Sequence, residues 1–167
     1  MKTTLISLIV LLCIVTENSL AGDVEMQEEK ATIEDVIKNS IGWALTKDKD
    51  LLYSTLANDS TLFFYNPDDS FVDGFDQFQE TVDGFFMDDR FKATAFDVKD
   101  MRIQLSQSRD VAWWACILND YGEWDGRSTS WINTRWTGVL EKMDGQWRIR
   151  QMHFSFPEGK RQAEEDK

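Results

Sequence analysis

Residues 127–157 read RSTSWINTRWTGVLEKMDGQWRIRQMHFSFP and contain the clearest structural signal in the chain. Two long runs with β-strand composition flank the dipeptide Asp144-Gly145. Asp-Gly readily adopts the positive backbone angles of a tight turn, so these residues are predicted to form a β-hairpin. The hairpin also contains Arg135 and the single histidine of the chain, His153, so any pocket chemistry is expected to draw on it.

Strand patterns also dominate the residues just before this hairpin. Residues 91–105 alternate between apolar and polar side chains, with a break of phase at Phe96 and Val98, and the polar pair Lys99-Asp100 predicts a bulge or bend. Residues 111–121, VAWWACILNDY, are apolar at both alternating sets of positions, which predicts a central strand covered on both faces. A loop at residues 122–126 is predicted to join this strand to the hairpin.

Helical patterns fill much of the first half of the chain. A first helix is predicted to begin at the N-cap Thr32, because the apolar residues after it recur at helical spacing. A short second helix is predicted around residues 51–56, and a third after Gly74, where phenylalanines form a stripe typical of a core. Short strands are predicted at 61–65 and 71–72. Helices first and antiparallel strands afterwards predict an α+β domain, with one sheet curling around the helices.

The two ends of the chain have the composition of segments outside this domain. Residues 1–21 are typical of a signal peptide, with Lys2, an apolar run too short to span a bilayer comfortably, and small residues before the cleavage point. We therefore expect a secreted or periplasmic protein without stable membrane insertion after cleavage; an uncleaved anchor is the alternative. Residues 22–30 are acidic and predicted to be flexible. Residues 31–157 form the predicted domain, and residues 158–167 a disordered polar tail.

The composition argues against several classes of function. A net charge of -12 disfavours a nucleic-acid partner, because phosphate binding needs concentrated lysine and arginine. Cys13 leaves with the predicted signal peptide, so Cys116 and His153 alone cannot form a thiolate–imidazole zinc site. There is also no glycine-rich phosphate loop. We therefore predict no nucleic-acid partner, no metal site and no cofactor.

The end of the chain carries a motif with a family resemblance. The residues GVL at 138–140 are followed by DGQWRI at 144–149 and by HFS at 153–155. With the order of elements, this motif resembles the SnoaL-like branch of the nuclear transport factor 2-like superfamily, and it is similar to the end of the association domain of calmodulin-dependent kinase II. The resemblance covers residues 32–157. It implies a cone, in which a strongly bent, mostly antiparallel sheet wraps over three helices and leaves a pocket at the open end.

The same resemblance implies a homodimer that pairs through the convex face of the sheet. This agrees with the pattern of residues 111–121, since helices can cover only one face of that strand and a partner subunit could cover the other. A monomer with loops over its sheet is the alternative.

His153 and Asp120 are the candidate catalytic residues. Histidine titrates near neutral pH and can act as a general acid or base; a hydrogen-bonded structural histidine is the alternative. Enolate chemistry of the ketosteroid isomerase-like and polyketide cyclase-like relatives needs such a base, and a donor such as Tyr65 for the oxyanion. By strand alternation His153 shares a face with Trp147 and Ile149, and the sequence leaves open whether that face lines the pocket.

The candidate ligand-binding residues are Tyr65, Trp114, Arg135 and Trp136. Arg135 lies among apolar neighbours, so it either binds a carboxylate ligand through its guanidinium fork or pairs internally with Asp120. Trp114 and Trp136 are candidates for lining an apolar pocket, and Trp114 must point away from its neighbour Trp113.

These residues predict a domain that binds a small apolar or carboxylated molecule in the pocket of the cone. One alternative is a cofactor-free isomerase- or cyclase-type enzyme that transfers a proton in the same pocket. The other is a structural dimerisation domain. The question for the structure is whether His153, Asp120 and Arg135 converge on one cavity.

Overall fold

The computed structural model describes the backbone of residues 3–68 and 70–157, and the side chains from residue 22 onward within those ranges. The helical elements are α1 (Thr3–Gly42), the 3-10 helix η1 (Trp43–Leu45), α2 (Lys49–Thr55), α3 (Phe75–Thr81) and the π-helix η2 (Val82–Phe86). The strands are β1 (Phe63–Tyr65), β2 (Phe71–Asp73), β3 (Phe91–Leu105), β4 (Val111–Trp124), β5 (Arg127–Ser128), β6 (Trp131–Met143) and β7 (Gln146–Ser155). The chain divides into two compact units, Met1–Ile33 and Glu34–Lys167.

The first unit consists of the leading part of α1. Residues 22–30, predicted to be flexible, are helical instead, because glutamate, glutamine, methionine and lysine are good helix formers. Thr32, predicted to be the N-cap, lies inside the helix, and its hydroxyl donates to the carbonyl oxygen of Glu28 at 3.1 Å. The side chains of the predicted signal peptide, residues 1–21, lie outside the described residues. Among the residues whose side chains are described, no helix is long and apolar enough to cross a membrane.

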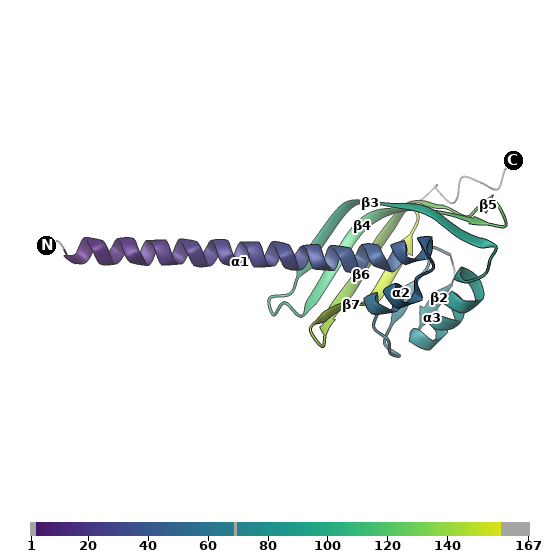
Figure 1. Ribbon diagram of the computed structural model, residues 1–167, viewed down its shortest axis with the longest axis horizontal. Helices are drawn as coiled ribbons and strands as arrows, with labels where there is room; N and C mark the ends of the chain where they lie inside the picture. The colour runs from purple at the N-terminus through teal and green to yellow at the C-terminus, as the bar shows by residue number, and fades with distance from the viewer. Residues whose placement is uncertain (1–2, 69, 158–167) are drawn as a thin grey trace. The chain divides into compact units, whose positions relative to one another are not determined.

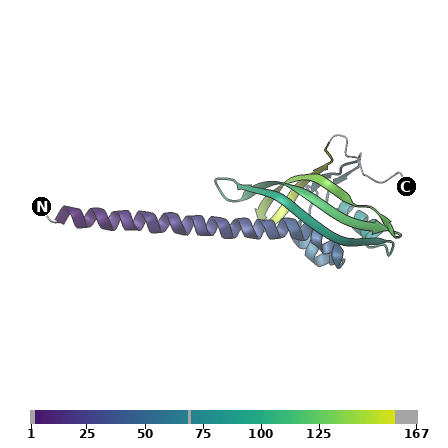
Figure 2. The same ribbon diagram turned by 90° about the horizontal axis from the view of Figure 1, so that it is seen from above.

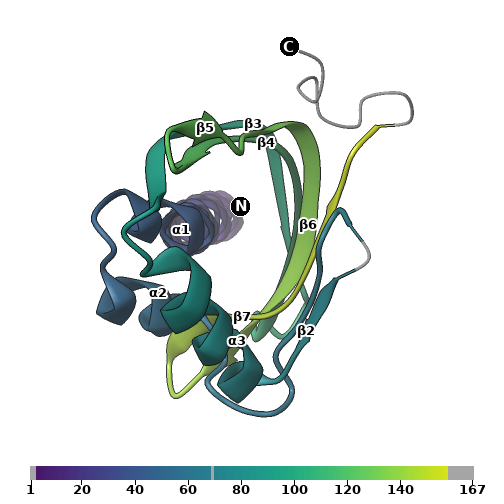
Figure 3. The same cartoon turned by 90° about the vertical axis from the view of Figure 1, so that its right-hand side faces the viewer.

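The second unit is built on one mixed sheet, in the order β2-β1-β7-β6-β4-β3, with β5 paired to β4 (Figure 1). The β1–β7 pair is parallel, whereas the other pairs are antiparallel. The sheet is strongly curled, and α2 and α3 lie on its concave side (Figure 3). This arrangement confirms the predicted α+β cone.

Local turn chemistry explains how the long strands connect. Asp144 and Gly145 have φ angles of 50° and 79°, as the predicted β6–β7 hairpin requires. A second Asp-Gly pair, Asp125 and Gly126, takes φ angles of 51° and 76°. This pair makes the turn between β4 and β5 so tight that β4 extends to Trp124, and the loop predicted at 122–126 shrinks to two residues.

Two bulges lie in β3, the longest strand, which runs beside β4 (Figure 2). The predicted bulge near Asp100 is confirmed, because the β3–β4 register shifts between Lys99 and Arg102 and Asp100 has a φ angle of 53°. A further shift occurs around Thr94, whose hydroxyl donates to the carbonyl oxygen of Tyr121 at 3.0 Å. Each bulge adds local twist, which helps the sheet to curl around the helices.

The inner face of the sheet holds the core. Trp114 and Trp136 are buried there with their rings edge to face, 5.6 Å apart between centroids. The Trp114 ring crosses the neighbouring strand at Gly138, where a Cβ atom would overlap that ring and the carbonyl oxygen of Gln151. Glycine is therefore required at position 138 by packing.

Among the residues that the structure describes, none covers the opposite face of β4 at Trp113 and Ala115. Trp113 is 48% exposed, and Ala115 is also exposed, whereas Trp114 and Cys116 are buried. The predicted opposition of Trp113 and Trp114 is thus confirmed. In the single subunit, β4 is buried on one face only, although the prediction was burial on both.

Candidate ligand pocket

A cavity of about 410 Å³ lies within the second unit. It is lined by the end of α1, by η1, α2, α3 and η2, and by inner-face residues of the sheet. Eight of its lining residues are aromatic: Trp43, Phe64, Phe78, Phe85, Phe86, Phe91, Trp131 and Phe154. This volume and this wall suit a small, largely apolar molecule.

Ring contacts hold the aromatic wall in place. Phe86 meets Trp43 edge to face at 5.7 Å and Phe91 at 5.1 Å. Phe85 stacks on Trp124, outside the wall, at 4.9 Å and 8° between planes. Such pairs each add about 0.5–1.5 kcal/mol beyond the area they bury, so the wall is largely pre-formed.

Asp120 is the charged residue of the sheet that lines this pocket. On β4, residues 112, 114, 116 and 118 point inward, and Asp120 continues the same alternation. Its register partner on β6 is Trp131, which also lines the cavity.

A bulge on β6 is what turns Trp131 inward. Between the pairs Leu118–Thr134 and Asp120–Trp131, β6 contains one residue more than β4, and Asn133 has a φ angle of 55°. The Asn119 side-chain carbonyl accepts a hydrogen bond from the Asn133 backbone N–H at 2.8 Å. Without the extra residue, the alternation would point Trp131 out of the pocket.

The environment of Asp120 disfavours its charge. Burial raises the pKa of Asp120 to about 6. Among the described residues, no hydrogen bond or ion pair reaches its carboxylate. An ionised carboxyl without a partner in an apolar wall is energetically costly, so Asp120 is poised to accept a hydrogen bond or a proton from a ligand.

Asp68 is the other charged residue among the described lining residues. It lies in the loop between β1 and β2, and its carboxylate accepts from the Ser70 hydroxyl at 2.6 Å and the Ser70 backbone N–H at 2.8 Å. These hydrogen bonds lower the pKa of Asp68, so this carboxyl is ionised near neutral pH. The described lining therefore contains two acids and no lysine, arginine or histidine.

The structure does not bring His153 to Asp120. The β6–β7 register pairs Val139 with Gln151 but Leu140 with Ile149, so Arg150 is an extra residue in β7. This bulge reverses the alternation: Ile149 and the pocket residue Met152 are buried, whereas His153 is exposed on the opposite face. The predicted shared face of His153 and Ile149 is therefore wrong.

Tyr65 and Arg135 lie on that same outer face. His153 pairs in register with both Tyr65 and Thr137, and its ring meets Tyr65 edge to face at 6.2 Å. Arg135, opposite Ile117 on β4, is exposed and is not paired with Asp120. Neither residue lines the cavity, so neither can supply the oxyanion donor or the carboxylate-binding group there.

Trp114 and Trp136 are buried, but they stand behind the pocket wall and do not line it. Trp136 stacks on the lining residue Phe154 at 5.6 Å and 13° between planes. Cys116, on the same strand face, has its pKa raised to about 12 by burial, which makes the thiol unreactive.

Of the predicted site residues, Asp120 alone lines the cavity. Its partners Trp131 and Phe154, and the acid Asp68, were not predicted as site residues. The phenylalanine stripe after Gly74 was visible in the sequence and was interpreted as core. Phe78, Phe85 and Phe86 from that stripe in fact line the pocket.

Comparison with known proteins agrees with the cone. Residues 33–159 match the SnoaL-like domain family, so the chain belongs to that family. No curated protein matches the sequence. An NTF2-like protein from Cytophaga hutchinsonii is 18% identical, with a TM-score of 0.61 over 77% of this chain and 98% of that one.

Two similar structures come from Novosphingobium aromaticivorans. An NTF2-like protein with a cystatin-like fold is 14% identical, with a TM-score of 0.65 over 85% of this chain and 90% of that one. A proposed scytalone dehydratase is 15% identical, with a TM-score of 0.66 over 80% of this chain and 86% of that one. At these identities the similarity establishes the fold and leaves the ligand to the pocket.

Proposed function

We propose that this protein binds a small apolar molecule in the aromatic pocket. The observation that carries the proposal is the pocket of about 410 Å³, whose lining includes eight aromatic residues and one carboxylate without a partner. The sequence also predicted a carboxylated ligand as an alternative. That alternative has no support, because Arg135 lies outside the cavity and the charged residues among the described lining are both acidic.

Indole, a neutral apolar probe, tests this proposal by calorimetry. We expect the protein to bind it, and Ala44→Trp to abolish binding, because Ala44 lines the cavity and the new ring would fill it. Ser54→Trp is the matched control, since Ser54 is exposed on α2 and outside the pocket. Equal binding by both variants would place the site elsewhere. Native mass spectrometry of protein purified from its host would reveal a retained natural ligand.

A second candidate function is proton transfer at carbon, as in an isomerase- or cyclase-type enzyme. It is favoured by the Asp120 carboxyl, since a pKa of about 6 in an apolar pocket suits a general base. Tyr65 and His153 lie on the outer face, so the predicted oxyanion donor and second base are not available to it. Exchange of α-hydrogen for deuterium in an enolisable ketone, abolished by Asp120→Asn, would support it.

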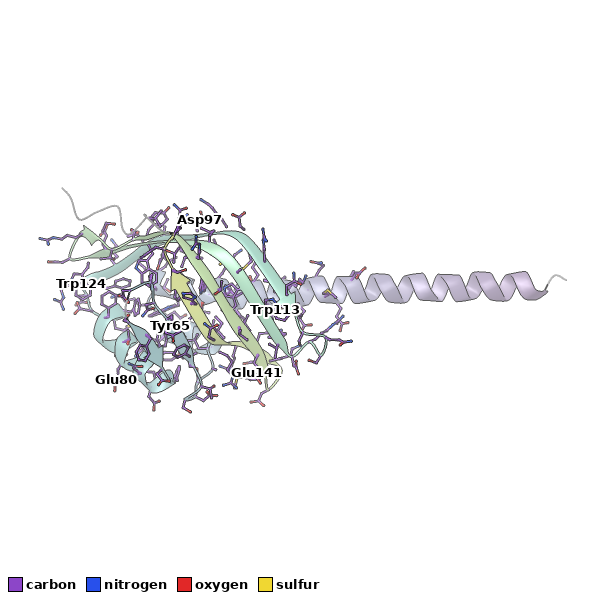
Figure 4. The ribbon with its side chains drawn as sticks, turned by 180° about the vertical axis from the view of Figure 1, so that it is seen from behind. Tyr65, Glu80, Asp97, Trp113, Trp124 and Glu141 are labelled. Carbon is purple, nitrogen blue, oxygen red and sulfur yellow. The ribbon has the colours of Figure 1, made fainter. Side chains whose placement is uncertain are left out.

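We also propose that two subunits pair through the outer face of the sheet. That face carries a row of cross-strand neighbours, Tyr65, His153, Thr137 and Ala115, flanked by Trp113. Tyr65 and Trp113 are labelled in Figure 4. Tyr65 is 52% and Trp113 48% exposed, and burying these rings would supply the missing cover of β4. Sedimentation should show a dimer that Trp113→Glu dissociates. Leu45→Glu, at an exposed leucine of η1, should leave the dimer intact.

Secretion is the remaining part of the proposal. It is supported by Lys2, by the apolar run that follows and by the small residues before Gly22. Mass spectrometry of the exported protein should find Gly22 at the N-terminus. A retained Met1 would contradict the cleavage.

A further inference from the structure

We propose that the ligand of this pocket is a protonated amine carried on an apolar or aromatic skeleton. This inference rests on the proposed function, because it names the chemical class of the molecule that the same cavity takes. It goes further by assigning to Asp120 the role of counter-charge for the ligand.

The charges of the lining point to a cation. Among the described lining residues, the charged groups are Asp120, on β4, and Asp68, in the β1–β2 loop. An anionic ligand would meet two acids and no basic side chain. Asp120 lies in the apolar wall, where like charges repel more strongly than in water, and the exposed Asp68 adds a weaker repulsion, so a carboxylate or phosphate ligand is disfavoured on electrostatic grounds.

Two basic side chains near the pocket, Lys47 and Arg90, have partners other than Asp120. Lys47 donates to the carbonyl oxygen of Asp88 at 2.8 Å. Arg90 forms an ion pair with Asp88 at 2.7 Å and places its guanidinium over the Trp124 ring at 4.6 Å. Neither contact involves Asp120, which therefore keeps an uncompensated carboxylate that a ligand ammonium group can neutralise.

The rings around Asp120 add a second attraction for a cation. Trp131 is its register partner, and Phe154 meets Trp131 edge to face at 5.5 Å. The faces of aromatic rings carry partial negative charge, so a desolvated ammonium near them gains a cation–π contribution. The remaining rings offer an apolar surface for the skeleton of the ligand.

The proposal predicts that amines bind more weakly as pH falls, which is the opposite of the dependence expected for an anionic ligand. A close ion pair with an ammonium group needs Asp120 ionised, and burial raises the pKa of Asp120 to about 6, so most of the preference for amines should be lost as pH falls below that value. Asp68 is the other titratable group facing the cavity, and its pKa is lowered by Ser70, so it stays ionised over this range. The neighbours Phe96 on β3 and Trp131 on β6 do not titrate.

Two matched series of ligands test the proposal by calorimetry. The first consists of tryptamine, tryptophol and indole acetate, and the second of octylamine, octanol and octanoate. Within each series the skeleton is similar and the end group is cationic, neutral or anionic. At about pH 7.5 the amine should bind about tenfold more tightly than the alcohol, as for a hydrogen bond to a charged group, and the acid most weakly.

Two variants connect the preference to Asp120. Asp120→Asn should lose most of the preference for the amine over the alcohol, and so should the wild-type protein at about pH 5, because only the screened charge of the exposed Asp68 then remains. Glu80→Gln removes the same charge from an exposed position on α3, outside the pocket, and should keep the preference (Figure 4). A preference that Asp120→Asn leaves undiminished would overturn the role given to this carboxylate.

The outcomes separate this inference from the proposed function. If alcohols bind as tightly as amines, or acids bind most tightly, the amine inference is overturned while pocket binding stands. If no member of either series binds, pocket binding itself fails.

Discussion

Replacing Asp120 by asparagine should stabilise the ligand-free protein at neutral pH. Asparagine has nearly the same shape but no charge, so the substitution removes the cost of an ionised group that lacks a partner in the apolar wall. We expect the variant to be more stable than the wild-type protein even though it loses a polar group of the pocket. Stability given up at a binding site is typical of functional residues.

The magnitude follows from the displacement of the pKa. Burial raises the pKa of Asp120 from 3.8 to about 6, a difference of about 2 units, and each unit corresponds to about 1.4 kcal/mol. A raised carboxyl pKa means that the folded protein binds the proton more tightly than the unfolded chain does. Folding stability therefore falls as pH rises from about 4 to about 6, and about 3 kcal/mol is the upper limit of the loss at neutral pH.

Urea denaturation of both proteins between about pH 4 and pH 8 measures this effect. The free energies of unfolding should differ by a small, constant amount at the acid end, and the gap should widen in favour of Asp120→Asn up to about pH 6. Glu80→Gln is the control, because Glu80 is exposed and should show no such widening. A gap independent of pH would refute the claim that Asp120 is largely shielded from water without a partner.

Three further predictions concern other parts of the second unit. Gly138→Ala should cost about 3 kcal/mol or more in urea denaturation, because the added Cβ atom overlaps the Trp114 ring, whereas Gly84→Ala, with open space around it, should be neutral or stabilising. Hydrogen bonds from Thr61 and Arg150 lower the pKa of Asp59 to about 2, so Asp59→Asn should lower the melting temperature near neutral pH, and the difference should shrink as pH falls from about 4 towards 2. Peptide mapping after iodoacetamide treatment should find Cys116 unmodified in the folded protein at about pH 8 and modified after denaturation, since burial raises its pKa to about 12.

The pocket and the outer face suggest different tasks for the two sides of one sheet. The inner face supplies Asp120 and Trp131 to the cavity, whereas the outer face carries Trp113, His153 and Arg135. Because adjacent residues on a strand point to opposite sides, substitutions on β4 can test the two proposals independently. Trp113→Glu should change the oligomeric state without affecting ligand selectivity, and Asp120→Asn should do the reverse.

The sequence alone determined the features that depend on local chemistry. Asp-Gly pairs predict tight turns because both residues tolerate positive φ angles, and Asp144-Gly145 forms the expected hairpin. The Lys99-Asp100 break predicts a bulge for a similarly local reason, and the order of helical and alternating patterns predicts the α+β class. Residues 22–30 are an instructive exception, because acidity suggested flexibility while helix propensity prevailed.

Only the tertiary structure decided which side chains meet in the pocket. The face of a strand residue depends on counting in steps of two, so one extra residue reverses every assignment beyond it. The extra residue at Arg150 moved His153 to the outer face, and the bulge at Asn133 moved Trp131 into the pocket. Both depend on partners distant in sequence, such as Asn119, which accepts from the Asn133 N–H. The burial of Asp120, and with it the electrostatics of the site, arises only when the helices and the curled sheet pack together.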